Sequence, residues 1–125
     1  MDYLPIFLNI REQRCLVIGG GEVATRKAAM LIRAGARVHV VSHEISPALK
    51  ENLETHQGSY RLGSYEPADL NDVAIVIAAT DDEALNRRVH ADCRTRQLPV
   101  NVVDAPALCS FVFPSIVDRS PLVIA

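Results

Sequence analysis

At Cys15–Ala28 the sequence reads CLVIGGGEVATRKA: a short apolar run leads into three consecutive glycines, and a helical pattern follows them. Three glycines in a row are entropically costly, because glycine loses more backbone freedom on folding than any other residue. Beyond them, Ala24, Ala28 and Leu31 recur at helical spacing and form one face. We therefore expect a strand over residues 15–19, a tight turn whose backbone must be free of side chains, and a helix.

The rest of the chain continues this alternation of strand and helix. Further strands are predicted at 37–41, 59–65, 72–80 and 98–104, further helices at 46–55 and 81–97, and two β-rich pieces within 109–125. The apolar run at 6–10 is expected to lie beside the first strand. Strands that alternate with helices over short connections form an open parallel sheet with helices on both faces. The predicted fold class is therefore α/β, a doubly wound, mostly parallel, Rossmann-like sheet.

Composition argues against several classes of protein. The 125 residues fit one domain, 49% are hydrophobic and 22% charged, and the net charge is −2 with Lys and Arg spread along the chain. This pattern argues against a nucleic-acid or anionic-membrane partner. The longest apolar stretch, 73–79, is far shorter than the about 20 residues of a membrane helix. Three cysteines without CxxC spacing, and no signal-peptide pattern, predict a cytoplasmic protein with buried thiols.

The glycines match a dinucleotide-binding pattern. Gly19, Gly21 and Ala24 have the spacing G-x-G-x-x-(G/A), with a predicted strand before them and a helix after them. In that pattern Gly19 permits the tight turn, Gly21 lets a pyrophosphate approach the backbone, and Ala24 lets the helix pack against the sheet. Free amides at the helix start, those of Glu22 and Val23, are then expected to bind the phosphates. The alternative is a glycine-rich turn that only packs tightly.

The choice of cofactor depends on the end of the second strand. About 20 residues past the glycines, an acidic residue commonly binds the ribose hydroxyls of NAD. Here the sequence is VVSHE, residues 40–44, so His43 and Glu44 are the candidates. No arginine falls in this stretch to hold a 2′-phosphate, which favours NAD over NADP. Both candidates are equally well interpreted as solvent-exposed loop residues.

Two more residues are expected at the carboxyl edge of the sheet, where open α/β sheets bind ligands. Thr80, at the end of AATDD, is a candidate for cofactor contact, or for capping the helix that follows. Asp104 ends NVVD and is either an acid–base group or a turn residue in Asp-Ala-Pro. The histidines and cysteines show no ligand spacing, so no protein-built metal site is predicted.

Three stretches carry a resemblance to a known family: residues 4–36, AATDD at 78–82, and NVVDAPALCSFVFPSIVDRSPLVIA at 101–125. The chain resembles the N-terminal module of siroheme synthases, which combines precorrin-2 dehydrogenase and sirohydrochlorin ferrochelatase. The resemblance covers essentially the whole chain. It implies oxidation of precorrin-2 to sirohydrochlorin with NAD, and then insertion of ferrous iron, a substrate that the tetrapyrrole nitrogens bind, to give siroheme.

The resemblance also implies site residues and a larger assembly. Asp104 matches the family's proposed catalytic aspartate, and we expect it to be partly shielded from solvent, because burial makes a carboxylate a better base. Arg119 is a candidate for binding tetrapyrrole carboxylates, or a turn arginine in solvent. In the family the nucleotide domain continues into a helical dimerisation region. We therefore expect residues 1–125 to be an NAD-binding domain truncated from a longer, homodimeric chain, with little or no turnover alone.

Two other functions stay open from the sequence. The segment AATDDEALN resembles the regulatory NAD-sensing domains of potassium-transport proteins, which bind a cofactor without chemistry. A dehydrogenase for another small substrate is the third possibility. Asp104 and the PSIVDRSP segment favour the siroheme enzyme, because a sensor has no evident need for either.

Overall fold

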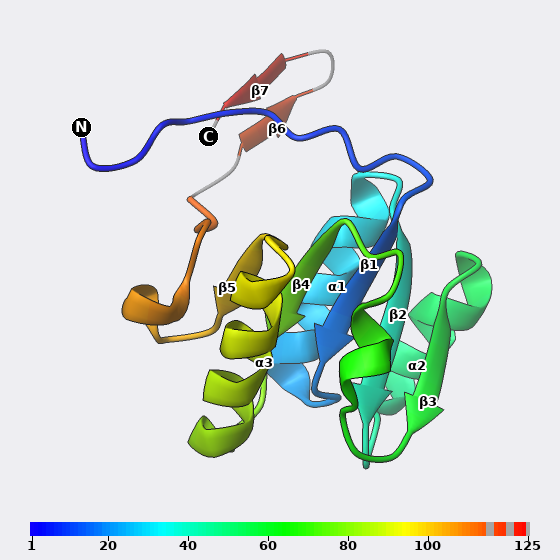
Figure 1. Ribbon diagram of the computed structural model, residues 1–125. Coiled ribbons are helices and arrows are strands. Elements are labelled where there is room, and N and C mark those ends of the chain that lie inside the picture. The colour runs from blue at the N-terminus through cyan, green and yellow to red at the C-terminus, as the bar shows by residue number, and fades with distance from the viewer. Residues whose placement is uncertain (115–116, 120–121, 125) are drawn as a thin grey trace.

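The computed structural model describes residues 1–114, 117–119 and 122–124. One sheet holds five strands in the order β3-β2-β1-β4-β5, each parallel to its neighbours (Figure 1). The strands are β1 (Arg14–Ile18), β2 (Arg37–Ser42), β3 (Ser59–Leu62), β4 (Ile75–Ala78) and β5 (Val100–Val102). The helices are α1 (Glu22–Arg33), α2 (Pro47–Thr55) and α3 (Glu83–Thr95), with short 3-10 helices η1 (Pro67–Leu70) and η2 (Pro106–Leu108). An antiparallel pair, β6 (Val117–Arg119) and β7 (Leu122–Ile124), follows. The predicted doubly wound parallel sheet is confirmed.

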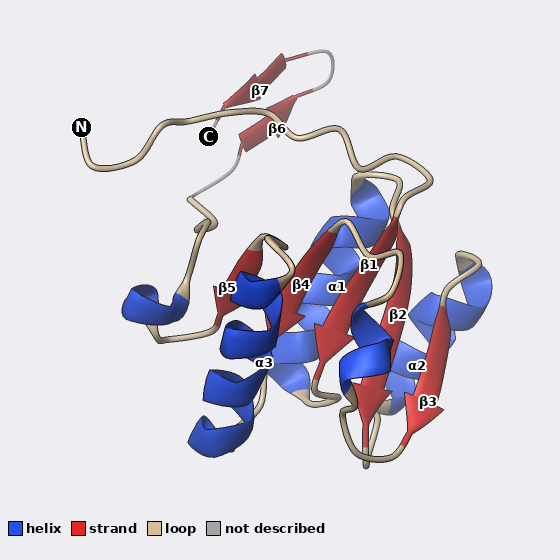
Figure 2. Ribbon diagram, viewed as in Figure 1, coloured by secondary structure: helices blue, strands red, loops and turns tan. Residues whose placement is uncertain are grey.

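Helices cover both faces of the sheet (Figure 2). Side chains of a strand alternate between faces, and β1 follows this rule: Cys15 and Val17 belong to the core beneath α1 and α2, whereas Leu16 and Ile18 belong to the core beneath α3 and η1. All four are fully or almost fully buried. Burying a side chain of this size contributes about 2 kcal/mol, so the continuous apolar run of β1 stabilises both layers.

The order of the strands creates the place for a site. β1 and β4 are neighbours, with Ile18 paired to Ala78, but the chain leaves β1 into α1 on one face and leaves β4 into α3 on the other. Where neighbouring strands send their connections to opposite faces, a crevice opens at the carboxyl edge of the sheet. Segments 19–21 and 79–82 border this crevice.

Short-range features of the sequence determine where the helices begin, end and pack. The predicted inner face of α1, Ala24, Ala28 and Leu31, is buried. Gly35 follows the C-cap of α1 with φ of +86°, a left-handed conformation that glycine adopts without strain. Ser46 caps α2, because its Oγ accepts a hydrogen bond of 3.1 Å from the amide of Leu49. The helices could therefore be placed from caps and periodicity.

Two expectations were wrong in part. β3 ends at Leu62 rather than reaching residue 65, because Gly63 has φ of +155° and turns the chain away from β2. The apolar run at 6–10 does not lie beside β1 as a whole: residues 6–9 are exposed and only Ile10 packs into the core. In the described part of the chain, no helix has the length and apolar character to cross a bilayer.

Candidate functional site

The glycine turn joins β1 to α1 at the carboxyl edge and is wedged between two loops. At Gly19, where φ is +123°, an added Cβ would lie 2.2 Å from the carbonyl oxygen of Ala79, in the loop after β4. At Gly20, a Cβ would lie 1.9 Å from the carbonyl oxygen of Glu44, in the loop after β2. Neither position has room for a side chain. The spacing of the glycine motif does not predict a role for Gly20, because the need for glycine there comes from contact with a segment distant in the sequence.

Gly21 differs from the other two, because an added Cβ there would meet nothing within 4 Å. Gly21 is the N-cap of α1, with extended backbone, and no side chain of the described residues caps the helix. The first amides of a helix have no partner within it, and the positive end of the helix dipole attracts anions. The turn therefore leaves the amides of Glu22 and Val23 and the open space at Gly21 to an anionic ligand.

Hydrogen bonds hold the turn in place from the side of α2. The amide of Ser46 donates to the carbonyl of Gly20 (2.9 Å), and the hydroxyl of Thr25 donates to the carbonyl of Gly21 (2.7 Å). The two hydroxyls, of Thr25 and Ser46, lie 2.8 Å apart. Since the proton of Thr25 is used on Gly21, the Ser46 hydroxyl donates to Thr25. The N-terminal ends of α1 and α2 are thus tied together through the turn.

His43 and Glu44 lie beside the glycine turn, in the loop after β2. Both side chains are exposed, and the carbonyl of Glu44 is the one that faces Gly20. Nε2 of His43 lies 3.1 Å from Oγ of Ser64, in the loop after β3. The structure therefore brings both candidates to the edge of the crevice. Neither is built into the core.

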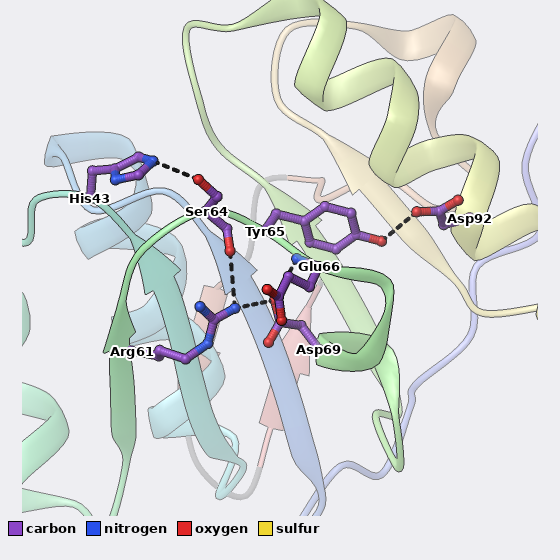
Figure 3. A network of polar contacts seen from close by, with 7 residues as sticks. All are labelled: His43, Arg61, Ser64, Tyr65, Glu66, Asp69 and Asp92. Carbon is purple, nitrogen blue, oxygen red and sulfur yellow. Dashed lines mark hydrogen bonds and ion pairs between the residues drawn. The ribbon is translucent and has the colours of Figure 1, made fainter.

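An arginine lies close to this loop, and the sequence analysis missed it (Figure 3). Arg61 is on β3, paired in register with Val41 of β2. Its Nη2 donates to the carbonyl of Ser64 (3.1 Å) and to Oδ2 of Asp69 (2.5 Å). Burial on its own would raise the pKa of Asp69, but the hydrogen bonds from Arg61 and from the amide of Glu66 lower it. Asp69 therefore stays ionised and neutralises the guanidinium.

Thr80 is engaged within the protein. Its hydroxyl lies 2.6 Å from Oδ1 of Asn86 and accepts from the amide of Asp82 at 3.2 Å. The cap of α3 is Asp82, whose carboxylate accepts from the amide of Leu85 at 3.1 Å. Thr80 thus shapes the loop before α3, but the alternative that it caps the helix is wrong, because Asp82 is the cap. Thr80 still follows Ala79, which touches the glycine turn.

Asp104 lies in the turn after β5, with φ of +61°. The turn interpretation of Asp-Ala-Pro is therefore confirmed, since Asp tolerates this conformation better than most residues. The amide of Val103 donates to the carbonyl of Ala78 at 3.0 Å, which places the turn next to the crevice. The expected shielding of Asp104 is wrong: its side chain is exposed, because β5 is the last strand of the sheet and the described residues do not cover the turn.

Other reactive groups lie apart from the crevice. Burial raises the pKa of the Cys15 thiol to about 11 and that of the Cys93 thiol to about 12, so neither is a thiolate at neutral pH. Across residues 1–114, 117–119 and 122–124 there is no group of three His, Cys, Asp or Glu side chains that could hold a metal ion. The side chain of Arg119 lies outside the described part of the chain.

Comparisons with known proteins agree with this geometry. A family model described as NAD(P)-binding matches residues 6–115. The chain is similar to siroheme synthases over its whole length, with 56% identity to that of Pseudomonas fluorescens (strain Pf0-1) and 51% to that of Methylobacillus flagellatus. It spans 27% of the length of each of these relatives. A solved structure, "SirC, precorrin-2 dehydrogenase", is 27% identical with a TM-score of 0.85, covering 98% of this chain and 60% of that one.

Proposed function

The chain belongs to the NAD(P)-binding family, and from that premise we propose that it is the dehydrogenase module of a siroheme synthase, oxidising precorrin-2 to sirohydrochlorin with NAD. The observation that carries the proposal is the carboxyl edge of the sheet. There a turn without side chains presents free helix amides, and the carboxylate-bearing turn at Asp104 lies two strands away beside β4. The similarity to siroheme synthases and to SirC supports the choice of substrate.

In this proposal NAD binds at the carboxyl edge of the sheet. Gly21 offers the space for a pyrophosphate, and the amides of Glu22 and Val23 bind its oxygens. His43 and Glu44 border the side of the crevice at β2 and bind the ribose, while Thr80 borders the side at β4. When bound, NAD supplies the acceptor for the hydride that leaves the substrate. Discrimination against NADP follows from the neutralised state of Arg61.

Asp104 takes the proton in the proposed reaction. Dehydrogenation removes a hydride and a proton from the macrocycle, and a carboxylate at the crevice is a suitable base. A solvent-exposed carboxylate is a weak base, so the turn must be covered before it works well. The bound tetrapyrrole, or the part of the protein beyond this chain, would exclude water from it.

Iron insertion is the finer part of the proposal. Ferrous iron enters as a substrate, and the four nitrogens of sirohydrochlorin supply its ligands, so the chain needs no metal cage of its own. Two pyrrole nitrogens each lose a proton as the iron enters, and Asp104 would accept these protons one at a time and release each to solvent. A homodimer of the whole protein and a cytoplasmic location stay predictions.

The test uses the full-length protein with precorrin-2 and NAD, followed by absorbance of sirohydrochlorin. Asp104→Asn should lower kcat by about 100-fold, the usual contribution of a positioned general base, while the Kd for NAD stays the same. Equal rates for wild type and variant would remove Asp104 from the mechanism. Wild-type protein that binds NAD but leaves precorrin-2 unchanged would instead favour the NAD-sensing alternative.

A further inference from the structure

A polar side chain takes a core position on α3. The inner face of α3 consists of Asn86, Val89 and Cys93, spaced by three and four residues, and all three are buried. Asn86 is only 6% exposed. Asparagine there costs free energy unless its amide is fully hydrogen-bonded, since burial of an unpaired polar group is unfavourable. The presence of Asn86 at this position therefore needs a reason.

Both ends of the Asn86 amide bind one residue. Its Nδ2 donates to the carbonyl of Thr80 at 3.0 Å, and its Oδ1 accepts from the hydroxyl of Thr80 at 2.6 Å. This pair of bonds fixes backbone and side chain of Thr80 together. Thr80 follows Ala79, whose carbonyl lies against Gly19 and whose amide donates to Ile18 at 2.8 Å. A continuous line of contacts therefore runs from α3 to the glycine turn.

Stabilising the start of α3 does not require Asn86. The carboxylate of Asp82 already caps the helix by accepting from the amide of Leu85. The backbone amide of Asn86 makes the ordinary bond of the first turn, to the carbonyl of Asp82 at 3.0 Å. The side-chain hydrogen bonds of Asn86 thus go to Thr80, in the loop between β4 and α3 that borders the crevice.

We propose that Asn86 is a positioning residue for dinucleotide binding. By holding Thr80, it keeps Ala79 against Gly19, so that the backbone of the crevice has its binding shape before the ligand arrives. A preset site loses less conformational entropy on binding, and this raises affinity. The inference rests on the proposed function for one point only, that the ligand of the crevice is a nicotinamide dinucleotide.

The experiment compares Asn86→Ala with the matched variant Asn101→Ala in the full-length protein. Asn101 is the other buried asparagine of the described residues, 7% exposed, and its Nδ2 also donates to a carbonyl, that of Phe111 at 3.0 Å. Calorimetric titration with NAD gives the Kd and the number of sites. Thermal unfolding without NAD gives the stability of each variant. Both substitutions should lower the melting temperature, because each leaves a partly buried carbonyl without its hydrogen bond.

Only Asn86→Ala should weaken NAD binding, by about tenfold, because Thr80 loses both of the hydrogen bonds with which Asn86 holds it. The number of sites should stay at that of the wild type, and KM for NAD should rise by the same factor while kcat at saturating NAD stays within about twofold. Fewer sites with unchanged Kd would mean a merely structural role and overturn the inference. If Asn86→Ala does not fold, Asn86→Asp, which keeps the acceptor for Thr80 but loses the donor, should show the same rise in Kd.

The outcomes separate this inference from the proposed function. Wild-type protein that binds NAD but does not oxidise precorrin-2 overturns the proposed function, while the binding data still decide the role of Asn86. Equal Kd values for Asn86→Ala, Asn101→Ala and wild type overturn the role of Asn86 and leave the dehydrogenase untouched. Wild-type protein without affinity for NAD overturns both.

Discussion

Three adjacent glycines serve two different needs at the level of single residues. Gly19 and Gly20 make room for other parts of the protein, the carbonyls of Ala79 and Glu44. Gly21 makes room for nothing within the described chain, which is the reason to assign it to a ligand. Motif spacing predicted the roles of Gly19 and Gly21. The motif could not predict the role of Gly20, because Gly20 and Glu44 are 24 positions apart in the sequence and meet only once the sheet has formed.

This difference predicts that alanine at these two neighbouring positions affects the stability of the protein differently. Gly21→Ala should leave the melting temperature nearly unchanged, since the added Cβ meets no protein atom, and should weaken NAD binding by at least about tenfold by blocking the pyrophosphate. Gly20→Ala should lower both stability and affinity, because the loop at Glu44 must move. Thermal unfolding and calorimetric titration of both variants check the prediction. Unchanged NAD affinity in Gly21→Ala would contradict the assignment of the pyrophosphate to this turn.

The ion pair between Arg61 and Asp69, near the proposed ribose site, predicts that removing the carboxylate shifts cofactor preference toward NADP. Asp69 holds the guanidinium of Arg61, which also binds the carbonyl of Ser64, next to His43. Asp69→Asn should free this positive charge for the 2′-phosphate of NADP and lower the Kd for NADP by about tenfold, the gain of one charge-assisted hydrogen bond. The Kd for NAD should stay the same.

The double variant Asp69→Asn with Arg61→Gln is the control, and it should lose the gain in NADP affinity. A gain that survives in the double variant would assign it to another cation. From the sequence, such an arginine was expected only in the loop after β2. Arg61 lies 17 positions beyond Glu44 in the sequence. The parallel register of β2 and β3 brings it close to that loop, and this pairing cannot be read from the sequence.

At the level of helices and strands, features that depend on local interactions can be predicted from the sequence. The cap at Ser46, the helix end at Gly35 and the apolar face of α1 all depend on residues a few positions apart, and the predicted apolar face was confirmed. Residues 6–9 and Asp104 were misjudged, because their burial depends on what packs against them. Apolar composition predicts a buried segment, but it does not say whether a covering surface exists.

The pairing of β2 with β3 predicts a dependence of stability on pH. His39 of β2 is half-buried, with Nδ1 2.7 Å from Oγ of Ser59 on β3. Burial lowers its pKa from the usual 6.5, and the nearby charge of Arg14 lowers it further. The unfolded chain therefore binds a proton at a pH where the folded protein does not. The free energy of unfolding should fall as pH decreases through 6.5 toward the lower pKa of the folded state.

Urea unfolding at several values between about pH 7.5 and about pH 5.5 measures this effect. His39→Gln should reduce the slope, since glutamine can still bond to Ser59 and does not titrate. A variant with the same slope as the wild type would show that other groups cause the dependence.

For the whole molecule, the proposed function predicts that cofactor binding and turnover depend on different parts of the protein. The glycine turn, the loop at His43 and the loop at Thr80 all lie at one edge of the sheet, and all five strands of that sheet belong to the described residues. Asp104 is at the same edge but exposed. The chain spans 27% of the length of its siroheme synthase relatives, and under the proposed function a cover for that turn would come from the remaining length. Dinucleotide binding should therefore be a property of this domain, and efficient turnover a property of the whole protein.

Isolated residues 1–125 should bind NAD with a Kd within about threefold of that of the full-length protein, because every backbone amide assigned to the pyrophosphate lies in this sheet and its helices. Their rate of precorrin-2 oxidation should be lower by at least about 100-fold, since an exposed Asp104 remains hydrated and is a poor base. Titration and absorbance assays on both proteins measure the two quantities, with Gly21→Ala in each as the control for specific binding. Full activity of the isolated domain would mean that the tetrapyrrole alone covers Asp104, whereas loss of NAD binding would place part of the cofactor site in the remainder of the protein.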